Sequence, residues 1–388
     1  MRVLRSSRAN FGALVIGLLT GITVAVAVAP VAATPPTYTG LVPARLLDTR
    51  AGSATVDGQF AGGGLVGAGA IVNVTVGGRG GVPASGVAAV AINVTVTAPT
   101  ATSFLTVFPN GAPRPTASNL NFTAGQTIAN MVIVPIGSDG QISLYNDAGQ
   151  THVLVDVLGW FAGEAGYHGF APARLLDTRA AGAPVGPASV TSVTVLGHGG
   201  LPDSSVGAVV VNLTATAPTA DSFITVYPAG APRPTASNLN FTLGQTIANM
   251  VIVPVGSDGQ ISIYNSAGMT HVLVDVLGWF GDSAGYAGFA PARLLDTRSG
   301  AATVDGQFAG VGQSGPASVL NLTVLGRGGV PNTGVGAVAI NLTAALPCVG
   351  SYATVYPGGA ARPVASNLNS APVRRSRTWS SFPLVATE

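Results

Sequence analysis

A serine, a histidine and an aspartate recur in this chain at matching positions and could form a hydrolase triad. They are Ser103, His152 and Asp156, with the second set Ser222, His271 and Asp275. A triad needs its histidine within hydrogen-bonding distance of both partners. His152 and Asp156 lie four positions apart on one expected strand, which separates them by roughly 13 Å. No Gly-x-Ser-x-Gly turn surrounds Ser103. We therefore predict no catalytic residues and no enzyme activity, with His152 and Asp156 on the wetter face of their strand.

Aspartates near turns offer a second chemistry, the binding of calcium. Two lie in matching Val-Asp-Gly-Gln-Phe segments and two in Asp-Gly pairs: Asp57, Asp305, Asp139 and Asp258. Calcium needs several oxygen ligands that converge on one point. Asp-Gly pairs more commonly form turns, since glycine accepts a positive φ. We predict turns at these positions, no metal site and no cofactor.

The elements that position these residues are repeated. The phrase Ala-Arg-Leu-Leu-Asp-Thr-Arg begins at Ala44, Ala173 and Ala292, with spacings of 129 and 119 residues. Such a period is too long for a solenoid and suits a complete small domain. We predict three repeats at 38–161, 167–280 and 286–369. Short joiners link them, so neighbouring repeats are expected to touch.

The repeated phrase itself has a structural interpretation. Leu46 and Leu47 are expected to be buried, Asp48 to accept from the following backbone, and Arg45 or Arg50 to pair with Asp48. Turn chemistry accounts for every residue of the phrase. The alternative is a polar binding rim present once per repeat.

Within one repeat the pattern is that of strands. Residues 71–76 and 91–97 alternate apolar and polar side chains, which indicates one buried and one wet face. Residues 131–136 are nearly all apolar and predict a central strand buried on both faces. The Ser138-Asp139-Gly140 turn that follows predicts a hairpin. Seven to nine short strands without helical periodicity predict an all-β chain of antiparallel β-sandwich, jelly-roll-like domains.

The start of the chain predicts export. Arginines at positions 2, 5 and 8 precede an apolar run over 11–29, and small residues follow at 31–33. This order is typical of a secretory signal peptide over residues 1–33. The alternative is an uncleaved membrane anchor, since the run approaches spanning length. We predict a secreted or cell-wall-associated chain with no membrane span in its mature part.

Composition excludes several classes of partner. Only 8% of the residues are charged and the formal net charge is +2, with no basic stripe for nucleic acid. A single cysteine, Cys348, excludes an intramolecular disulfide. Stability must therefore come from packed β-sheet cores.

The third repeat changes character at Ser370. Residues 370–388 lose the repeat pattern and gain arginine. With one base restored at Ser370, a permitted choice of codons translates the tail into Asn-Phe-Arg-Pro-Gly-Gln-Thr-Val-Glu-Asn-Val-Val-Ile-Val-Pro, which matches the repeat. We interpret this tail as a one-base frameshift, a hypothesis that resequencing tests. As written, repeat 3 is expected to lack its last three strands and to expose sheet edges.

Two regions are candidate binding sites. Aromatic residues close each repeat and open the next; they are expected to cap the ends of the sandwiches, and the alternative is that their clustering at the joiners forms a groove between repeats. The polar segment Arg-Pro-Thr-Ala-Ser-Asn-Leu-Asn forms a second candidate. The predicted binding residues are Arg114, Asn119, Asn121, Trp160, Tyr167, Arg233, Asn238, Asn240, Trp279 and Tyr286.

Four phrases together resemble a known type of repeat. Ala-Arg-Leu-Leu-Asp-Thr-Arg, Arg-Pro-Thr-Ala-Ser-Asn-Leu-Asn-Phe, Gly-Gln-Thr-Ile-Ala-Asn and Asp-Val-Leu-Gly-Trp-Phe are similar to a tandem module of secreted actinobacterial proteins. That resemblance implies an extracellular accessory module without established catalytic residues. We predict a multivalent module that binds a cell-wall or extracellular polysaccharide. The alternatives are a structural spacer or adhesin with protein partners and, third, a hydrolase.

Overall fold

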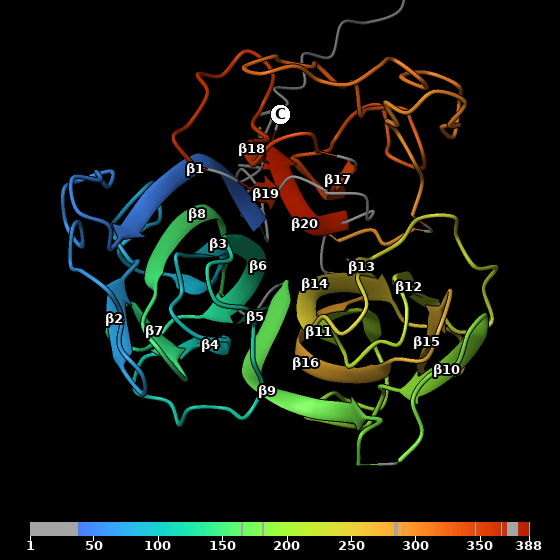
Figure 1. Ribbon diagram of the computed structural model, residues 1–388, viewed down its shortest axis with the longest axis horizontal. Helices are drawn as coiled ribbons and strands as arrows, with labels where there is room; N and C mark the ends of the chain where they lie inside the picture. Colours follow the sequence, from blue (N-terminus) through green and yellow to red (C-terminus); the bar gives the residue numbers. More distant parts are fainter. Residues whose placement is uncertain are drawn as a thin grey trace, which may run out of the picture. The chain divides into compact units, whose positions relative to one another are not determined.

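The computed structural model describes residues 38–387 apart from 164–165, 181, 283–285, 290, 346, 366 and 371–378. The predicted signal peptide lies outside the described residues. No helix occurs among the described residues, and the chain is all-β (Figure 1). The three repeats belong to one compact unit.

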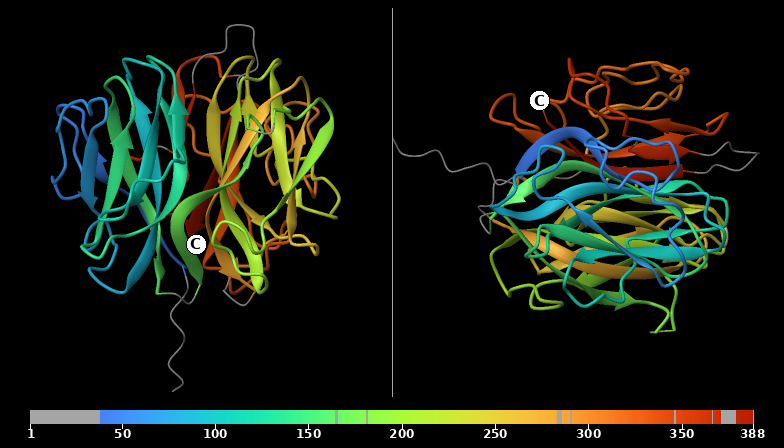
Figure 2. Two further views of the ribbon diagram at one scale, coloured as in Figure 1. Left: turned by 90° about the horizontal axis from the view of Figure 1, so that it is seen from below. Right: turned by 90° about the vertical axis from the view of Figure 1, so that its left-hand side faces the viewer.

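Repeat 1 folds into two four-stranded antiparallel sheets. The first, here called the contact sheet, has the order β1 (Tyr38–Asp48), β8 (His152–Ala162), β3 (Val87–Thr97) and β6 (Ile128–Pro135). The second, the surface sheet, has the order β2 (Ile71–Thr75), β7 (Gln141–Asn146), β4 (Ser103–Pro109) and β5 (Leu120–Phe122). These two four-stranded sheets confirm the predicted jelly-roll sandwich, and Figure 2 shows their strands from two further directions.

Repeat 2 has the same topology. Its contact sheet has the order β14 (Ile247–Pro254), β11 (Val206–Thr216), β16 (His271–Gly281) and β9 (Tyr167–Asp177). Its surface sheet has the order β10 (Ser189–Thr194), β15 (Gln260–Asn265), β12 (Ser222–Pro228) and β13 (Leu239–Phe241). The two repeats therefore place equivalent residues at equivalent positions.

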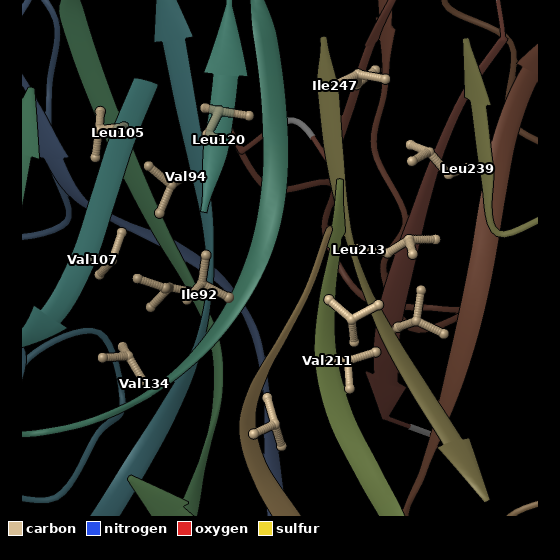
Figure 3. Close-up of a cluster of buried hydrophobic side chains, with 14 of the residues drawn as sticks. Ile92, Val94, Leu105, Val107, Leu120, Val134, Val211, Leu213, Leu239 and Ile247 are labelled. Carbon is tan, nitrogen blue, oxygen red and sulfur yellow. The ribbon is translucent and has the colours of Figure 1, made fainter. Parts of the chain in front are cut away.

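Alternating apolar residues build the core between the two sheets. Figure 3 shows this core in both repeats, with Ile92, Val94 and Leu105 in repeat 1 and Val211 and Leu213 in repeat 2. All five side chains are at most 1% exposed. Their β-branched and leucine side chains fit a pleated surface that is covered on one face, as the period-two pattern predicts.

A second buried cluster joins the repeats. It contains Ala91, Met131 and Leu158 from repeat 1 together with Val210 and Met250 from repeat 2, and Ile340 of repeat 3 packs against it. These residues lie on the other face of the contact sheets. Each contact sheet is thus covered on both faces, once by its own surface sheet and once by other repeats.

Two sequence predictions about these strands were wrong. Residues 131–136 belong mainly to β6, which is buried on both faces but lies at the edge of its sheet rather than in its centre. Contacts with other repeats, including those with β9 and β14, bury that edge strand. The Asp139-Gly140 turn is present, with Gly140 at φ 74°, but it connects β6 of the contact sheet to β7 of the surface sheet and is not a hairpin.

Repeat 3 is incomplete in a regular way. Its strands are β17 (Ala337–Ala345), β18 (Ser351–Ala353), β19 (Leu368–Ser370) and β20 (Trp379–Thr387). The expectation of three missing strands was wrong by one, because β20 pairs with β17 much as β14 pairs with β11. The counterparts of β15 and β16 are missing from the described residues.

Candidate functional site

The repeated Arg-Leu-Leu-Asp-Thr-Arg phrase builds a buried ion cluster. Arg45 donates from Nε and Nη2 to both carboxylate oxygens of Asp156, at 2.8 and 3.0 Å, and from Nη1 to Asp48 at 2.9 Å. The backbone N–H and the guanidinium of Arg50 also donate to Asp48. Leu46 and Leu47 are 0% and 3% exposed. The structural interpretation of the phrase is confirmed, and the arginine pairs with both carboxylates.

Burial and the neighbouring arginines shift the pKa values of the two aspartates of this cluster in opposite directions. Burial raises the pKa of Asp156 above the usual aspartate range, although the Arg45 guanidinium acts against the rise. At Asp48 burial acts in the same direction, but hydrogen bonds from Arg50 outweigh it and lower the pKa. The placement of Asp156 on a wetter face was wrong, since Asp156 is 0% exposed. The second face of β8 lies against other repeats, so it is not wet.

The three residues of the suggested hydrolase triad do not meet. Ser103 Oγ donates to Asn146 Oδ1 at 3.3 Å and accepts from the N–H of Ala148 at 2.7 Å. His152 Nδ1 lies 3.0 Å from Thr49 Oγ1, and Asp156 is held by Arg45. Each residue thus has a separate structural partner, and this geometry does not support the hydrolase alternative.

An arginine holds the Val-Asp-Gly-Gln-Phe segment. Arg79 donates to both oxygens of Asp57 at 2.6 and 2.7 Å, and its guanidinium lies 4.9 Å from the Phe60 ring centroid. Arg327, Asp305 and Phe308 repeat this arrangement in repeat 3. The hydrogen bonds from Arg79 lower the pKa of Asp57 to about 2. Among the described residues, no three acidic, histidine or cysteine side chains gather as metal ligands.

Repeat 2 supports this interpretation of the segment. It lacks the Val-Asp-Gly-Gln-Phe sequence, and its His198 stands where repeats 1 and 3 carry Arg79 and Arg327. The arginine and the segment are thus present together or absent together within one chain. This pairing indicates a structural clamp on the segment.

The aromatic residues at the joiners fill the contact between repeats instead of lining a groove. The ring of Phe161 lies 4.8 Å from that of Tyr38 and 5.1 Å from that of Tyr167. Phe280 lies in the same way between Tyr167 and Tyr286, at 5.3 and 4.7 Å. Tyr167 is 2% exposed and donates its hydroxyl to the carbonyl of Leu277. The place of the alternative groove at the joiners is therefore occupied by the protein's own side chains.

Four more predicted binding residues have structural partners. Asn119 Oδ1 accepts from the N–H of Val107 at 2.7 Å, and Asn238 accepts equally from Val226. Asn121 accepts from Ser118, and Trp279 stacks on His168 at 4.1 Å. Asn119 and Asn240 are 2% and 4% exposed. Burial leaves Asn119, Asn240 and Tyr167 no room to meet a ligand, whereas Trp160 and Trp279 keep partial exposure.

Arg114 and Arg233 remain as exposed candidates, and each covers a tyrosine. The Arg114 guanidinium lies 4.0 Å from the ring centroid of Tyr145, and Arg233 lies 3.9 Å from that of Tyr264. Phe104 and Phe223 tilt against the same two rings, at 6.4 and 6.3 Å. We call these two groups the arginine–tyrosine platforms.

An aliphatic residue extends each platform across the surface sheet. Ile71 of β2 is the register partner of Tyr145 and is 53% exposed. Val190 of β10 is the partner of Tyr264 and is 50% exposed. Neither Arg114 nor Arg233 forms a salt bridge with a described residue, whereas Arg45, Arg50 and Arg79 all do. Each platform thus combines an exposed apolar surface, formed by an aliphatic side chain and a tyrosine ring, with a planar guanidinium group whose N–H groups can donate hydrogen bonds.

The sequence predictions included the arginines but missed the tyrosines. Tyr145 and Tyr264 lie in short strands, Gln141–Asn146 and Gln260–Asn265, where the alternation places them on the outer face with Ser143 and Ser262. That alternation was a usable signal. The contact of a loop arginine with that face was not encoded in any local pattern.

The comparisons with known proteins identify no family for this chain. No protein-family model and no curated protein matches the chain. Among solved structures, the N-terminal CBM22-1–CBM22-2 tandem domain of Paenibacillus barcinonensis Xyn10C is 12% identical with a TM-score of 0.20, covering 62% of this chain and 98% of its own. A candidate secreted protein from Parabacteroides distasonis is 10% identical with a TM-score of 0.15, covering 53% and 81%. Similarity at these TM-scores carries no argument about this chain.

The part of the chain that the structure describes contains no helix long and apolar enough to cross a bilayer.

Proposed function

We propose that this chain is an exported, non-catalytic module that binds a cell-wall or extracellular polysaccharide at its arginine–tyrosine platforms. The observation that carries the proposal is the recurrence of one exposed arginine over one tyrosine in two repeats, at 4.0 and 3.9 Å. Sugar rings present apolar faces to aromatic and aliphatic side chains, and hydroxyl groups to N–H donors. Two platforms on one chain would add avidity on a polymer.

The unpaired guanidinium groups favour an acidic polysaccharide over a neutral one. Arginine binds carboxylate and phosphate groups through two parallel N–H donors. Arg114 and Arg233 are exposed and have no salt bridge among the described residues. Binding is therefore expected to weaken as salt is added, because exposed charges are screened.

The test is a pull-down of the whole chain with insoluble peptidoglycan, chitin and cellulose. Replacing both platform arginines, Arg114→Ala with Arg233→Ala, should abolish retention, and either single change should weaken it strongly because avidity is lost. Leu243→Ala is the matched control, since Leu243 is 67% exposed and lies outside both platforms. Equal retention of the double variant would refute the platforms as the site. No retention of the native chain on any polymer would favour the spacer or adhesin alternative.

A further inference from the structure

The two arginine–tyrosine platforms differ in charge at one position. In repeat 1, the hydroxyl of Tyr145 donates to Asp147 Oδ1 at 3.2 Å. Asp147 is exposed, and the guanidinium of Arg114 covers the face of the same ring at 4.0 Å. This tyrosine therefore has a cation at its face and an anion at its hydroxyl.

The platform of repeat 2 has no carboxylate at this position. Ser266 stands where repeat 1 carries Asp147. The backbone follows the same path in both repeats, since the N–H of Asp147 donates to the carbonyl of Phe104 at 3.2 Å. The N–H of Ser266 donates in the same way to Phe223 at 3.1 Å. The hydroxyl of Tyr264 has no hydrogen bond to a described residue, so it is free to donate to a ligand.

A further acidic difference between the two repeats lies outside the platforms. Asp221 replaces Thr102, and its carboxylate accepts from the N–H of Leu243 at 2.8 Å. Leu243 follows β13, which lies on the opposite side of β12 from β15, the strand that carries Tyr264. Asp221 is therefore held towards the far edge of the sheet and does not restore the charge that Ser266 lacks.

This difference changes what each platform offers to a ligand. In repeat 2, the guanidinium of Arg233 and the hydroxyl of Tyr264 are both hydrogen-bond donors, and a carboxylate or phosphate group accepts from such donors. In repeat 1, the carboxylate of Asp147 repels an anion and accepts hydrogen bonds. A donor and an acceptor on one ring match the hydroxyl groups of an uncharged sugar, since a hydroxyl both donates and accepts.

We infer that the two platforms bind different units of the polymer, with its anionic groups at repeat 2 and its uncharged sugar units at repeat 1. The inference rests on the proposed function and narrows the ligand to a polysaccharide in which acidic and neutral units occur together. Asp147 and Ser266 determine the selectivity, because the arginine and the tyrosine are common to both platforms. Carboxylate and phosphate groups share the chemistry that Arg233 recognises, and the experiment separates them.

The experiment titrates the whole chain with short tetramers instead of a polymer, which limits avidity. The probes are tetragalacturonate for carboxylate, a glycerol phosphate tetramer for phosphate, and cellotetraose for neutral sugar. Calorimetry in buffer of low ionic strength, where charges are least screened, should show one site per chain for one of the two anionic tetramers. Arg233→Ala should remove that site, and Arg114→Ala should reduce the binding of cellotetraose.

Exchange of the two selecting residues tests the assignment directly. Asp147→Ser should add a second site for the anionic tetramer, and Ser266→Asp should weaken the first site about fivefold, because a like charge then lies beside the bound anion. Each residue is native at the equivalent position of the other repeat, so the fold accepts both. Asp221→Asn is the matched control, since it removes the same charge as Asp147→Ser outside the platforms and should leave both sites unchanged.

Three outcomes would overturn the inference: two anionic tetramers bound per native chain, an exchange without effect, or no binding of either anionic tetramer. The pull-down distinguishes these outcomes from a failure of the proposed function. Retention of the native chain that is lost in the double arginine variant would keep the platforms as the site, even if they do not differ in selectivity. Absence of retention on every polymer, together with absence of binding to every tetramer, would overturn both proposals.

Discussion

Arg45 and Asp156 stand 111 positions apart in the chain and form a bidentate ion pair between β1 and β8, with N–O distances of 2.8 and 3.0 Å. The pair is buried from solvent, since the side chain of Arg45 is 8% exposed and that of Asp156 is 0% exposed. It fixes the first strand of the repeat to the last. The same relationship joins Arg174 to Asp275 in repeat 2.

Asp156→Ala should therefore lower the free energy of unfolding by about 3–5 kcal/mol, because it leaves a buried guanidinium without one of its partners. Asp275→Ala should cost less, since the Arg174 side chain is 28% exposed and can reach water. Urea denaturation followed by tryptophan fluorescence measures both. Arg45→Met with Asp156→Leu should recover most of the loss. A loss below about 1 kcal/mol in Asp156→Ala, as for a surface pair, would contradict this account.

The clamp between Asp57 and Arg79 should make stability depend on pH in the acid range. The pKa of Asp57 is lowered to about 2 in the folded chain, below the roughly 3.9 of an unfolded aspartate. Its contribution is then complete above pH 4 and is lost as pH falls towards 2. The difference in stability between the native chain and Asp57→Asn should shrink over that interval in urea titrations. A difference that stays constant or grows would refute the clamp.

Sequence patterns predicted the sandwich well because strands such as β3 and β11 place every second residue in the core between the sheets. The sequence patterns failed where another repeat covers the second face of a strand. Asp156 was predicted to be exposed to solvent, and residues 131–136 were predicted to form a central strand. Both predictions were wrong because local alternation cannot show that another repeat packs on the far face of a sheet. Of the candidate site, Arg114 and Arg233 were predicted, whereas Tyr145 was missed because its contact joins a loop to a strand far away in sequence.

Buried tyrosines should resist ionisation at alkaline pH. Burial raises the pKa of Tyr286 to about 12, and burial raises the pKa of Tyr38 and Tyr167 further. Because these folded-state values exceed the unfolded value of roughly 10, stability is intact below pH 10 and falls as pH rises above it. Absorbance near 295 nm should show a late phase, coupled to unfolding, from these three tyrosines. In Tyr286→Phe the amplitude of this late phase should fall by one tyrosine, and the absence of a late phase would contradict the burial.

Phe161→Ala should destabilise repeat 2 as well as repeat 1. Phe161 belongs to β8 of repeat 1, yet its ring lies 5.1 Å from Tyr167 and 5.9 Å from Phe280, both in repeat 2. Removing a buried phenylalanine costs about 3–5 kcal/mol, and this loss falls on a cluster that the repeats share. Native-state hydrogen exchange should therefore lose protection in Tyr167–Asp177 and His271–Gly281.

The matched control is Phe122→Ala, which removes a ring of the same size from the sandwich core of repeat 1, where Phe122 is 1% exposed. That core belongs to one repeat, so the loss of exchange protection should be greatest in strands β3 to β8 and smaller in repeat 2. If Phe161→Ala instead leaves protection in repeat 2 unchanged, the two repeats are energetically independent despite their contact. If both variants lower protection equally in both repeats, the whole unit unfolds in one step, and the effect is not specific to the shared cluster.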